Sequence, residues 1–147
     1  MNNITRCKPL LGTFVEISVE ADADAAFLIE SSEKAFNEMK KIENSMSFHN
    51  PESELSKLNR LAAKEPVRIS DHLWNVLQRA QYYSELSDGA FDVTTAGALV
   101  RNRQLPDHGI KFSATANWEN IKMESNNVFY EKPLLIDLGG IAKGYAV

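Results

Sequence analysis

The amino-acid sequence predicts an α+β fold with a mixed or antiparallel sheet and packed helices. Residues 10–20 alternate apolar and polar side chains, which is the period of a strand with one buried face. Residues 22–46 and 70–86 instead repeat apolar side chains every three or four positions, which is the period of a helix. Strand and helix patterns do not alternate strictly along the chain, so a parallel βαβ sheet is not indicated.

The strand predicted at residues 10–20 and the helix after it each bury one face. Val15, Ile17 and Val19 share the buried side of the strand, and Gly12 permits a bulge or a close approach. Asp22 or Asp24 fits the cap of the following helix. The buried face of that helix is expected to carry Leu28, Ala35, Met39, Ile42 and Met46.

The middle of the chain predicts two further helices, separated by a turn and a short extended segment at residues 65–70. After a polar loop at residues 45–53, a short helix is expected at 53–59. Ser70 fits the N-cap of a longer helix that ends near residue 86, and Gly89 fits a left-handed position after it. Its buried stripe is expected to be Leu73, Val76, Leu77, Ala80 and Tyr83.

Later segments complete the predicted fold. A third helix is expected to end near residue 103, and residues 104–117 show no period, which indicates an irregular connection. Residues 120–131 alternate around an asparagine-rich turn, which predicts a β-hairpin.

Composition excludes several classes of protein. The chain has 147 residues, a formal net charge of −4 and a pI near 5.4, which disfavours nucleic acid as the main partner. Its length suits one domain or a piece of a larger one. Cys7 is the only cysteine, so no internal disulfide is possible. No apolar run approaches the ~18 residues of a membrane span, and no signal peptide is seen, so a cytoplasmic location is expected.

The C-terminal stretch suggests an anion site. Leu134, Leu135 and Ile136 predict a buried strand that ends at Asp137, and residues 139–140 are two glycines that predict a tight turn into a helix. Backbone N–H groups at such a helix start attract phosphate, and Lys143 adds a full positive charge. The stretch matches neither the P-loop nor the dinucleotide fingerprint, so a purely structural turn is an open alternative.

Two upstream segments also carry candidate chemistry. Asp92 is placed to accept from an exocyclic amine or a ribose hydroxyl, or simply to cap the next helix together with Thr94. Phe48 and His49 form a planar pair in a polar loop, suited to stacking on a flat ligand or simply solvated. The three histidines are scattered without a metal-binding spacing.

Four stretches, taken together, resemble a known family. They are LLGTFVEI at 10–17, SFHNPESELSKLN at 47–59, SDGAFDVT at 87–94 and IDLGGIAKGYA at 136–146. In order and spacing they are similar to the flavin transferases of the ApbE family, and the resemblance extends over nearly the whole chain from about Arg6.

The resemblance implies a reaction and a fold. Family members hold FAD with Mg²⁺, and a Ser or Thr hydroxyl of a target protein attacks the FMN phosphorus so that AMP leaves. Cleavage of a pyrophosphate requires neutralisation of the charge on its oxygens, which a bound Mg²⁺ supplies. The implied fold is T-fold-like. Family members are roughly twice as long, and their second half supplies the carboxylate and hydroxyl metal ligands and the candidate catalytic base. Residues 1–147 are therefore interpreted as the N-terminal part of a single domain, with an incomplete fold and no catalytic residue.

The resemblance also implies site residues, position by position. Leu11 falls at an FAD-contacting position that is usually Met, and His49 falls where the family usually has Tyr. Gly140 falls at the magnesium position, where only its backbone carbonyl can serve. The remaining implied FAD contacts are Ala90, Phe91, Asp92, Asp137 and Lys143.

Two alternative functions stay open at this point. The first alternative is an FAD pyrophosphatase, which gives FMN and AMP with water as acceptor. The second is a non-catalytic flavin-binding protein. The expected partners are FAD and a flavin-accepting target protein. Members of the family are often exported, which argues against the cytoplasmic location expected from the lack of a signal peptide.

Overall fold

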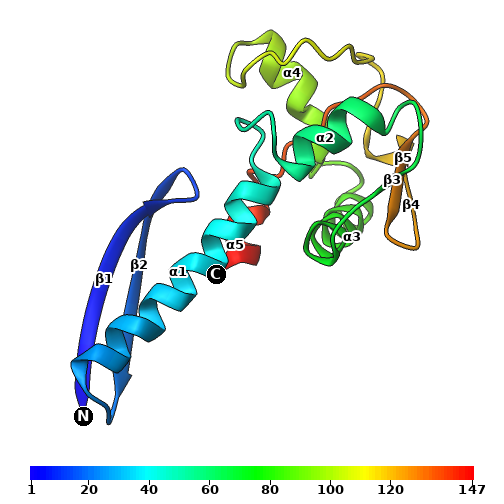
Figure 1. The fold of residues 1–147 in the computed structure, drawn as a ribbon. Coiled ribbons are helices and arrows are strands. Elements are labelled where there is room, and N and C mark those ends of the chain that lie inside the picture. Colours follow the sequence, from blue (N-terminus) through cyan, green and yellow to red (C-terminus); the bar gives the residue numbers. More distant parts are fainter. The chain divides into compact units, whose positions relative to one another are not determined.

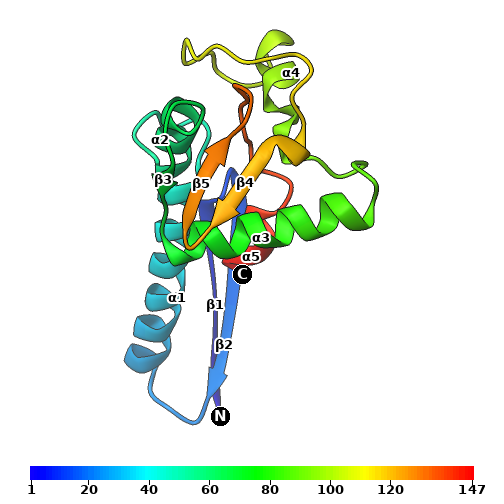
Figure 2. The same ribbon diagram turned by 90° about the vertical axis from the view of Figure 1, so that its right-hand side faces the viewer.

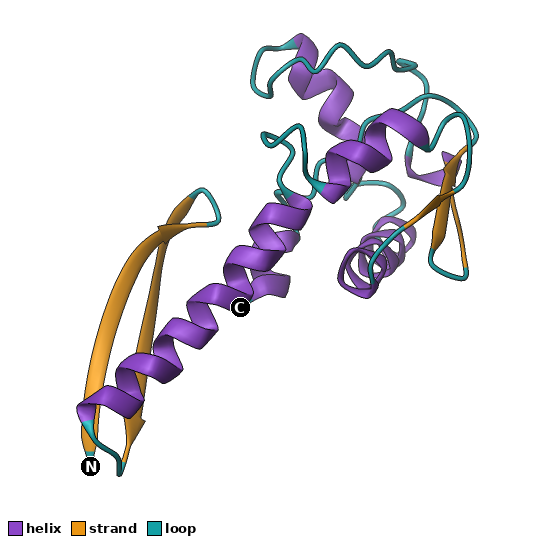
Figure 3. Cartoon of the chain, viewed as in Figure 1, coloured by secondary structure: helices purple, strands orange, loops and turns teal.

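The computed structural model describes residues 1–147 as two compact units, one of residues 1–43 with 146–147 and one of residues 44–145. Helices and short strands are mixed along the chain (Figures 1 and 3), as the α+β prediction requires. None of the helices combines the length and the apolar character that a membrane crossing requires.

The first unit contains a long antiparallel hairpin of β1 (Asn2–Leu10) and β2 (Thr13–Ala21). Leu11 and Gly12 form its turn with φ of 57° and 70°, a pair of left-handed residues that suits a tight two-residue hairpin. The strand predicted at residues 10–20 is present as β2, but it begins at Thr13 rather than at residue 10, and β1 was not predicted. The polar composition of β1, which includes Arg6 and Lys8, hides its strand period.

Helix α1 (Ala25–Met46) lies alongside the hairpin (Figures 1 and 2), and Asp24 caps it by accepting a hydrogen bond from the Phe27 N–H at 2.8 Å. Of the two residues offered as caps, Asp24 is therefore the one used. The buried cluster between helix and hairpin is Leu10, Phe36 and Met39. Ala35 was expected at the buried face, but Phe36, two turns after the fully buried Leu28, occupies it.

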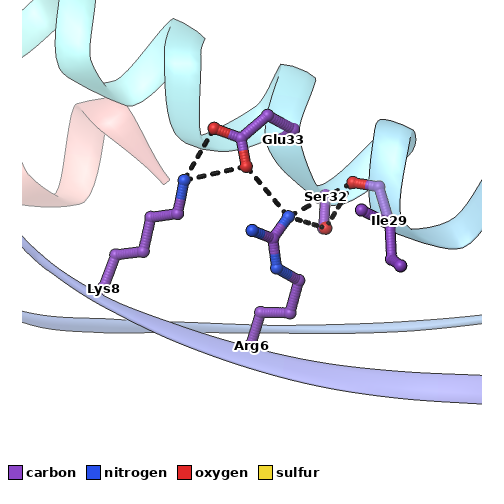
Figure 4. Close-up of polar contacts among 5 residues, drawn as sticks. All are labelled: Arg6, Lys8, Ile29, Ser32 and Glu33. Carbon is purple, nitrogen blue, oxygen red and sulfur yellow. Dashed lines mark hydrogen bonds and ion pairs between the residues drawn. The ribbon is translucent and has the colours of Figure 1, made fainter.

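Charged side chains of β1 attach the hairpin to α1 (Figure 4). Arg6 Nη1 lies 2.9 Å from both Ser32 Oγ and Glu33 Oε2, and Lys8 Nζ lies 2.6 Å from Glu33 Oε1. Lys8 Nζ also lies 4.9 Å from the centroid of the Phe36 ring. The two cations lower the pKa of Glu33, chiefly through the hydrogen bond from Lys8.

The second unit holds most of the regular elements. A small antiparallel sheet has the strand order β3 (Val67–Arg68), β5 (Asn127–Tyr130), β4 (Ile121–Glu124). It lies beside α3 (Asp71–Leu86; Figure 2), since Gln81 of α3 donates to the Ile121 carbonyl at 3.2 Å. The predicted 120–131 hairpin is confirmed, with Ser125 and Asn126 left-handed at its turn. The other helices of this unit are α2 (Glu54–Leu61), α4 (Ala96–Arg101) and α5 (Ala142–Ala146).

Helix starts and buried faces in this unit follow the sequence closely, with one exception. Ser70 caps α3 by accepting from the Leu73 N–H, as predicted, and Gly89 after the helix has φ of 78°. Tyr83 was expected in the buried stripe but is 45% exposed. The buried face continues instead from Ala80 to Ser84, four residues later, and the Tyr83 ring lies against Phe91.

Residues 134–138 correct another prediction. Leu134, Leu135, Ile136 and Leu138 are buried as expected, but the segment is not a strand because no neighbouring strand pairs with it. Its backbone hydrogen-bonds instead to the Asn59 side chain and to the Val93 carbonyl. The apolar run therefore predicted correctly that these side chains are buried, but wrongly that the segment pairs with a neighbouring strand.

Candidate functional site

One hydrogen bond joins two of the candidate segments. The Asp137 N–H donates to the Val93 carbonyl at 3.0 Å, so the residues after Gly89 lie against the residues before the glycine pair. A Cβ added to Gly140 would lie 3.5 Å from the Phe91 ring, which is ordinary van der Waals contact. Phe91 thus lies in the same part of the second unit as Asp137 and Gly140, although nearly fifty residues of sequence separate it from them.

Asp137 is the electrostatic centre of this place. Its carboxyl is half-buried, and burial raises its pKa because the charged form is desolvated. Hydrogen bonds from the backbone N–H groups of Gly139 and Leu138, and the interactions with the His49 and Lys143 side chains, act in the opposite direction on this pKa. A partly desolvated carboxylate beside a lysine is an environment typical of binding sites.

Of the two glycines, Gly139 is constrained, and the constraint is a close approach rather than its backbone conformation. Neither Gly139 nor Gly140 has a left-handed φ, and the turn closes through the N–H groups of Ile141 and Ala142, both donating to the Leu138 carbonyl. A Cβ on Gly139 would lie only 3.0 Å from Asp137 Oδ2. The absence of a side chain at residue 139 therefore lets the carboxylate fold back over the turn.

Asp92 caps the short 3-10 helix at Val93–Thr95. Its Oδ1 accepts from the Thr94 N–H at 2.8 Å and from Thr94 Oγ1 at 2.7 Å. This oxygen therefore serves as the cap, as one of the two interpretations from sequence predicted. Asp92 also borders a cavity of about 150 Å³. The cavity's other polar or charged side chains are Thr94, Thr95, Arg101 and Ser113, and Phe112 forms part of its apolar wall.

Phe91 is oriented by its own hydrogen bond and by a ring contact. Its N–H donates to Ser87 Oγ at 2.9 Å, and its ring meets Tyr83 edge to face with centroids 6.2 Å apart. Ala90, just before it, is exposed. The segment thus presents one small exposed residue, one fixed aromatic ring and one carboxylate in succession.

The loop that carries His49 is fixed by its neighbour. Phe48 is 3% exposed, its ring lies 5.5 Å from that of His108, and its carbonyl lies 2.8 Å from His108 Nε2. A carbonyl can only accept, so this nitrogen carries the proton. The suggestion that Phe48 stacks on a flat ligand is therefore wrong, because the ring is buried, whereas His49 is exposed.

Leu11 belongs to the first unit, at the tip of the β1–β2 hairpin. Its N–H donates to Glu43 Oε1 of α1 at 2.7 Å, which holds the left-handed turn in place. The other six predicted contacts (His49, Ala90, Phe91, Asp92, Asp137 and Lys143) and Gly140 belong to the second unit.

The backbone carbonyl of Gly140 is suited to serve as one ligand of a hard cation. The carbonyls of Leu138 and Ile141 accept backbone hydrogen bonds, while no hydrogen bond to the Gly140 carbonyl is present. A free carbonyl oxygen suits Mg²⁺, which takes oxygen ligands in octahedral geometry. No group of three His, Cys, Asp or Glu side chains is arranged to hold a metal ion.

Two residues that support the site were not predicted from sequence. Asn59 binds the backbone of Ile136, and its position four residues after Leu55, on the buried face of α2, was the available signal. His108 holds the Phe48 carbonyl from a region without any period, and no sequence signal marked it.

Comparison with known proteins identifies the family. The model of the ApbE family matches residues 11–147. The chain belongs to the ApbE family. An FAD:protein FMN transferase of Chlamydia pneumoniae is 30% identical, over 84% of this chain and 42% of that protein. One of Klebsiella pneumoniae is 29% identical, over 76% of this chain and 39% of that protein.

Solved ApbE structures confirm the α+β fold class. The ApbE protein of Thermotoga maritima matches with a TM-score of 0.86 and 25% identity, covering 99% of this chain and 50% of that one. A variant of the flavin transferase ApbE of Vibrio cholerae matches with a TM-score of 0.80 and 26% identity, covering 100% and 54%. The chain thus spans about half the length of the ApbE structures, and less than half of the curated relatives.

Proposed function

We propose that this protein takes part in the Mg²⁺-dependent transfer of FMN from FAD to a Ser or Thr hydroxyl of a target protein, with release of AMP. The observation that carries the proposal is the junction of residues 90–93 and 136–143 through the Asp137 N–H and the Val93 carbonyl. Several relatives bear the name FAD:protein FMN transferase. Because the chain spans about half of the solved ApbE structures, the part we assign to it is the binding of FAD.

The reaction sets clear demands on such a site. The acceptor oxygen forms a bond to the FMN phosphorus, the bond from that phosphorus to the AMP oxygen breaks, and the hydroxyl proton passes to a base. We assign no base to residues 1–147. Positioning and neutralisation of the phosphate charges provide most of the catalysis in such transfers.

Lys143 and Asp137 serve the phosphate end of FAD in this proposal. Lys143 is exposed and near enough to Asp137 to lower its pKa, so its ammonium group can reach a pyrophosphate oxygen beside the turn. Asp137 keeps this cation close and provides a carboxylate that a ligand hydroxyl can donate to.

The remaining contacts serve the organic parts of FAD. Asp92 Oδ1 is engaged by Thr94, which leaves Oδ2 to accept from an exocyclic amine or a ribose hydroxyl. Ala90 and Phe91 offer a small exposed surface and a fixed ring, while His49 and Leu11 offer a planar and an apolar contact.

The Gly140 carbonyl is the metal ligand that this chain would contribute. A bound Mg²⁺ would neutralise charge on the pyrophosphate oxygens. Its other ligands would be phosphate oxygens, water and groups outside residues 1–147, consistent with our proposal that these residues are the N-terminal part of one domain.

The test is an assay of the protein with FAD, Mg²⁺ and a candidate acceptor protein. We expect a fluorescent flavin that stays on the acceptor after denaturation, together with an equal amount of AMP. Folded protein that yields neither product would exclude the transferase.

Two controls separate the alternatives. Steady release of AMP without any acceptor protein would indicate an FAD pyrophosphatase instead. FAD binding without AMP under all conditions would indicate a non-catalytic flavin-binding protein, and equal FAD affinity in Lys143→Ala and Asp92→Ala would mean that these two residues are structural.

A further inference from the structure

Asn59 makes an unusual pair of bonds beside the candidate site. Its Nδ2 donates to the Ile136 carbonyl at 2.9 Å, and its Oδ1 accepts from the Ile136 N–H at 2.9 Å. This is the exchange of two hydrogen bonds that paired residues of neighbouring antiparallel strands make. One side chain on α2 thus replaces a strand beside residues 134–138.

The orientation of the Asn59 amide is fixed by a third bond. The Tyr130 hydroxyl, 3.3 Å from Asn59 Oδ1, donates to the same oxygen as the Ile136 N–H. Tyr130 is 1% exposed, and burial raises its pKa well above the ordinary value, so the hydroxyl keeps its proton. A flipped amide would bring its nitrogen toward the Ile136 N–H and its oxygen toward the Ile136 carbonyl, which would lose both bonds.

The other edge of residues 134–138 is held by the segment that contains Phe91 and Val93. In an extended chain, successive backbone groups point to opposite edges. Ile136 faces Asn59, and the next residue, Asp137, donates its N–H to the Val93 carbonyl at 3.0 Å. Asn59 and Val93 therefore hold adjacent residues from two sides, immediately before the turn that contains Gly140.

Asn59 itself has little freedom to move. It is 3% exposed, and Leu55 and Leu58 of the same helix are fully buried. A displacement of its amide would therefore shift Ile136 and, with it, the neighbouring Asp137. The Asp137 carboxyl accepts hydrogen bonds from the Gly139 and Leu138 N–H groups.

From this geometry we propose that Asn59, supported by Tyr130, is a positioning residue that sets the place of Asp137 and Lys143 for the FAD pyrophosphate. The inference rests on the proposed function. Asn59 acts through the backbone of Ile136 and does not touch the ligand.

The test is a calorimetric titration of FAD with Mg²⁺ into the wild-type protein and into Asn59→Asp. The aspartate keeps the shape and the acceptor oxygen but places a second oxygen against the Ile136 carbonyl. We expect a Kd raised by about tenfold or more at unchanged stoichiometry, because small misplacements of binding groups are costly. A merely structural role would lower the folded fraction and thus the stoichiometry, with the Kd unchanged, and would overturn the inference.

A matched control is Ser70→Ala, which removes the N-cap of α3 and one hydrogen bond to Glu54 at the start of α2. It should lower the melting temperature without removing any hydrogen bond to residues 134–143. Its Kd should equal that of the wild type. If Asn59→Asp raises the Kd no more than Ser70→Ala does, Asn59 is not a positioning residue.

A milder variant decides the case if Asn59→Asp does not fold. Tyr130→Phe removes one bond to Oδ1 and leaves the Asn59–Ile136 pair in place, so we expect a Kd raised severalfold, and an unchanged Kd would refute the role. Failure of the wild-type protein to bind FAD is a separate result, which would remove the proposed function and this inference with it.

Discussion

The two units of the molecule are stabilised in different ways. In the first, few side chains are buried: Leu10, Phe36 and Met39 form a cluster, and Leu28 and Ile42 are buried as well. Charged pairs from Arg6 and Lys8 to Glu33 add to this small core. In the second, side chains from α2, α3, β5 and residues 134–138 are fully or almost fully buried, among them Leu55, Leu58, Leu73, Val76, Leu77, Val128, Ile136 and Leu138. Six of the seven predicted FAD contacts and the predicted metal ligand belong to the unit with the larger apolar core.

This difference has a functional meaning. A carboxylate such as Asp137 can be partly desolvated only where apolar neighbours are packed densely enough to exclude water. Leu138 and Ile136, on either side of Asp137, are both fully buried. In the hairpin unit, by contrast, the Glu33 side chain that pairs with Arg6 and Lys8 is 41% exposed.

The largest expected effect tests the apolar core directly. Leu77→Ala in α3, where the side chain is 1% exposed, should lower the free energy of unfolding by about 2–5 kcal/mol. Ile17→Ala on the half-buried face of β2 is the matched change in the first unit and should cost about 1 kcal/mol. Urea denaturation followed by circular dichroism measures both, and equal losses would contradict the contrast between the units.

A second prediction concerns the glycine pair in the second unit. Gly139→Ala should lower the free energy of unfolding by about 1 kcal/mol, because its Cβ would crowd Asp137 Oδ2 at 3.0 Å. Gly140→Ala meets only ordinary contact with Phe91 and should be close to neutral. Thermal denaturation of the two variants side by side decides, and a reversed order would show that the close approach to Asp137 does not constrain residue 139.

The third prediction is a pH dependence of stability set by Asp137. Burial raises its pKa above 3.8, so the ionised form costs stability at neutral pH, and the cost is relieved as the pH falls through the raised pKa. Asp137→Asn keeps an acceptor for the backbone N–H groups and carries no charge. The variant should therefore be more stable than the wild type at neutral pH, and the gap should narrow on acidification.

Melting temperatures of Asp137→Asn and the wild type, measured from neutral pH down to the ordinary pKa of 3.8, give the difference in stability. The same variant should bind FAD more weakly at neutral pH, which would separate a stability cost from a binding role. A gap that stays constant with pH would show that the Asp137 charge is not the cause.

The smallest effect is expected in the first unit. Glu33→Gln should be slightly less stable than the wild type at neutral pH, because the lowered pKa of Glu33 reports a favourable interaction with Lys8 and Arg6. That stability is present above the ordinary pKa of 4.5 and is lost as the pH falls through the lowered pKa. Added salt should shrink the difference, since the pair is exposed, and a difference that resists both salt and acid would rule out an ionic origin.

Local sequence signals were sufficient to predict the two long helices and residues at their ends. Ser70, Asp24 and Gly89 act as helix termini, and Leu55 and Leu58 are buried, because caps and apolar periods are local properties of the chain. The four stretches of family resemblance were likewise visible without any coordinates. Such signals depend on residues within a few positions of one another.

Tertiary structure alone decided which partner each buried group has. The apolar run at residues 134–136 predicted a strand, yet its hydrogen bonds go to the side chain of Asn59, 77 positions away from Ile136. Strand β1 was hidden by its charged residues, and Phe36 rather than Ala35 faces the hairpin. A periodic pattern reports that a side chain leaves water, but it carries no information about which distant group will satisfy the backbone beside it.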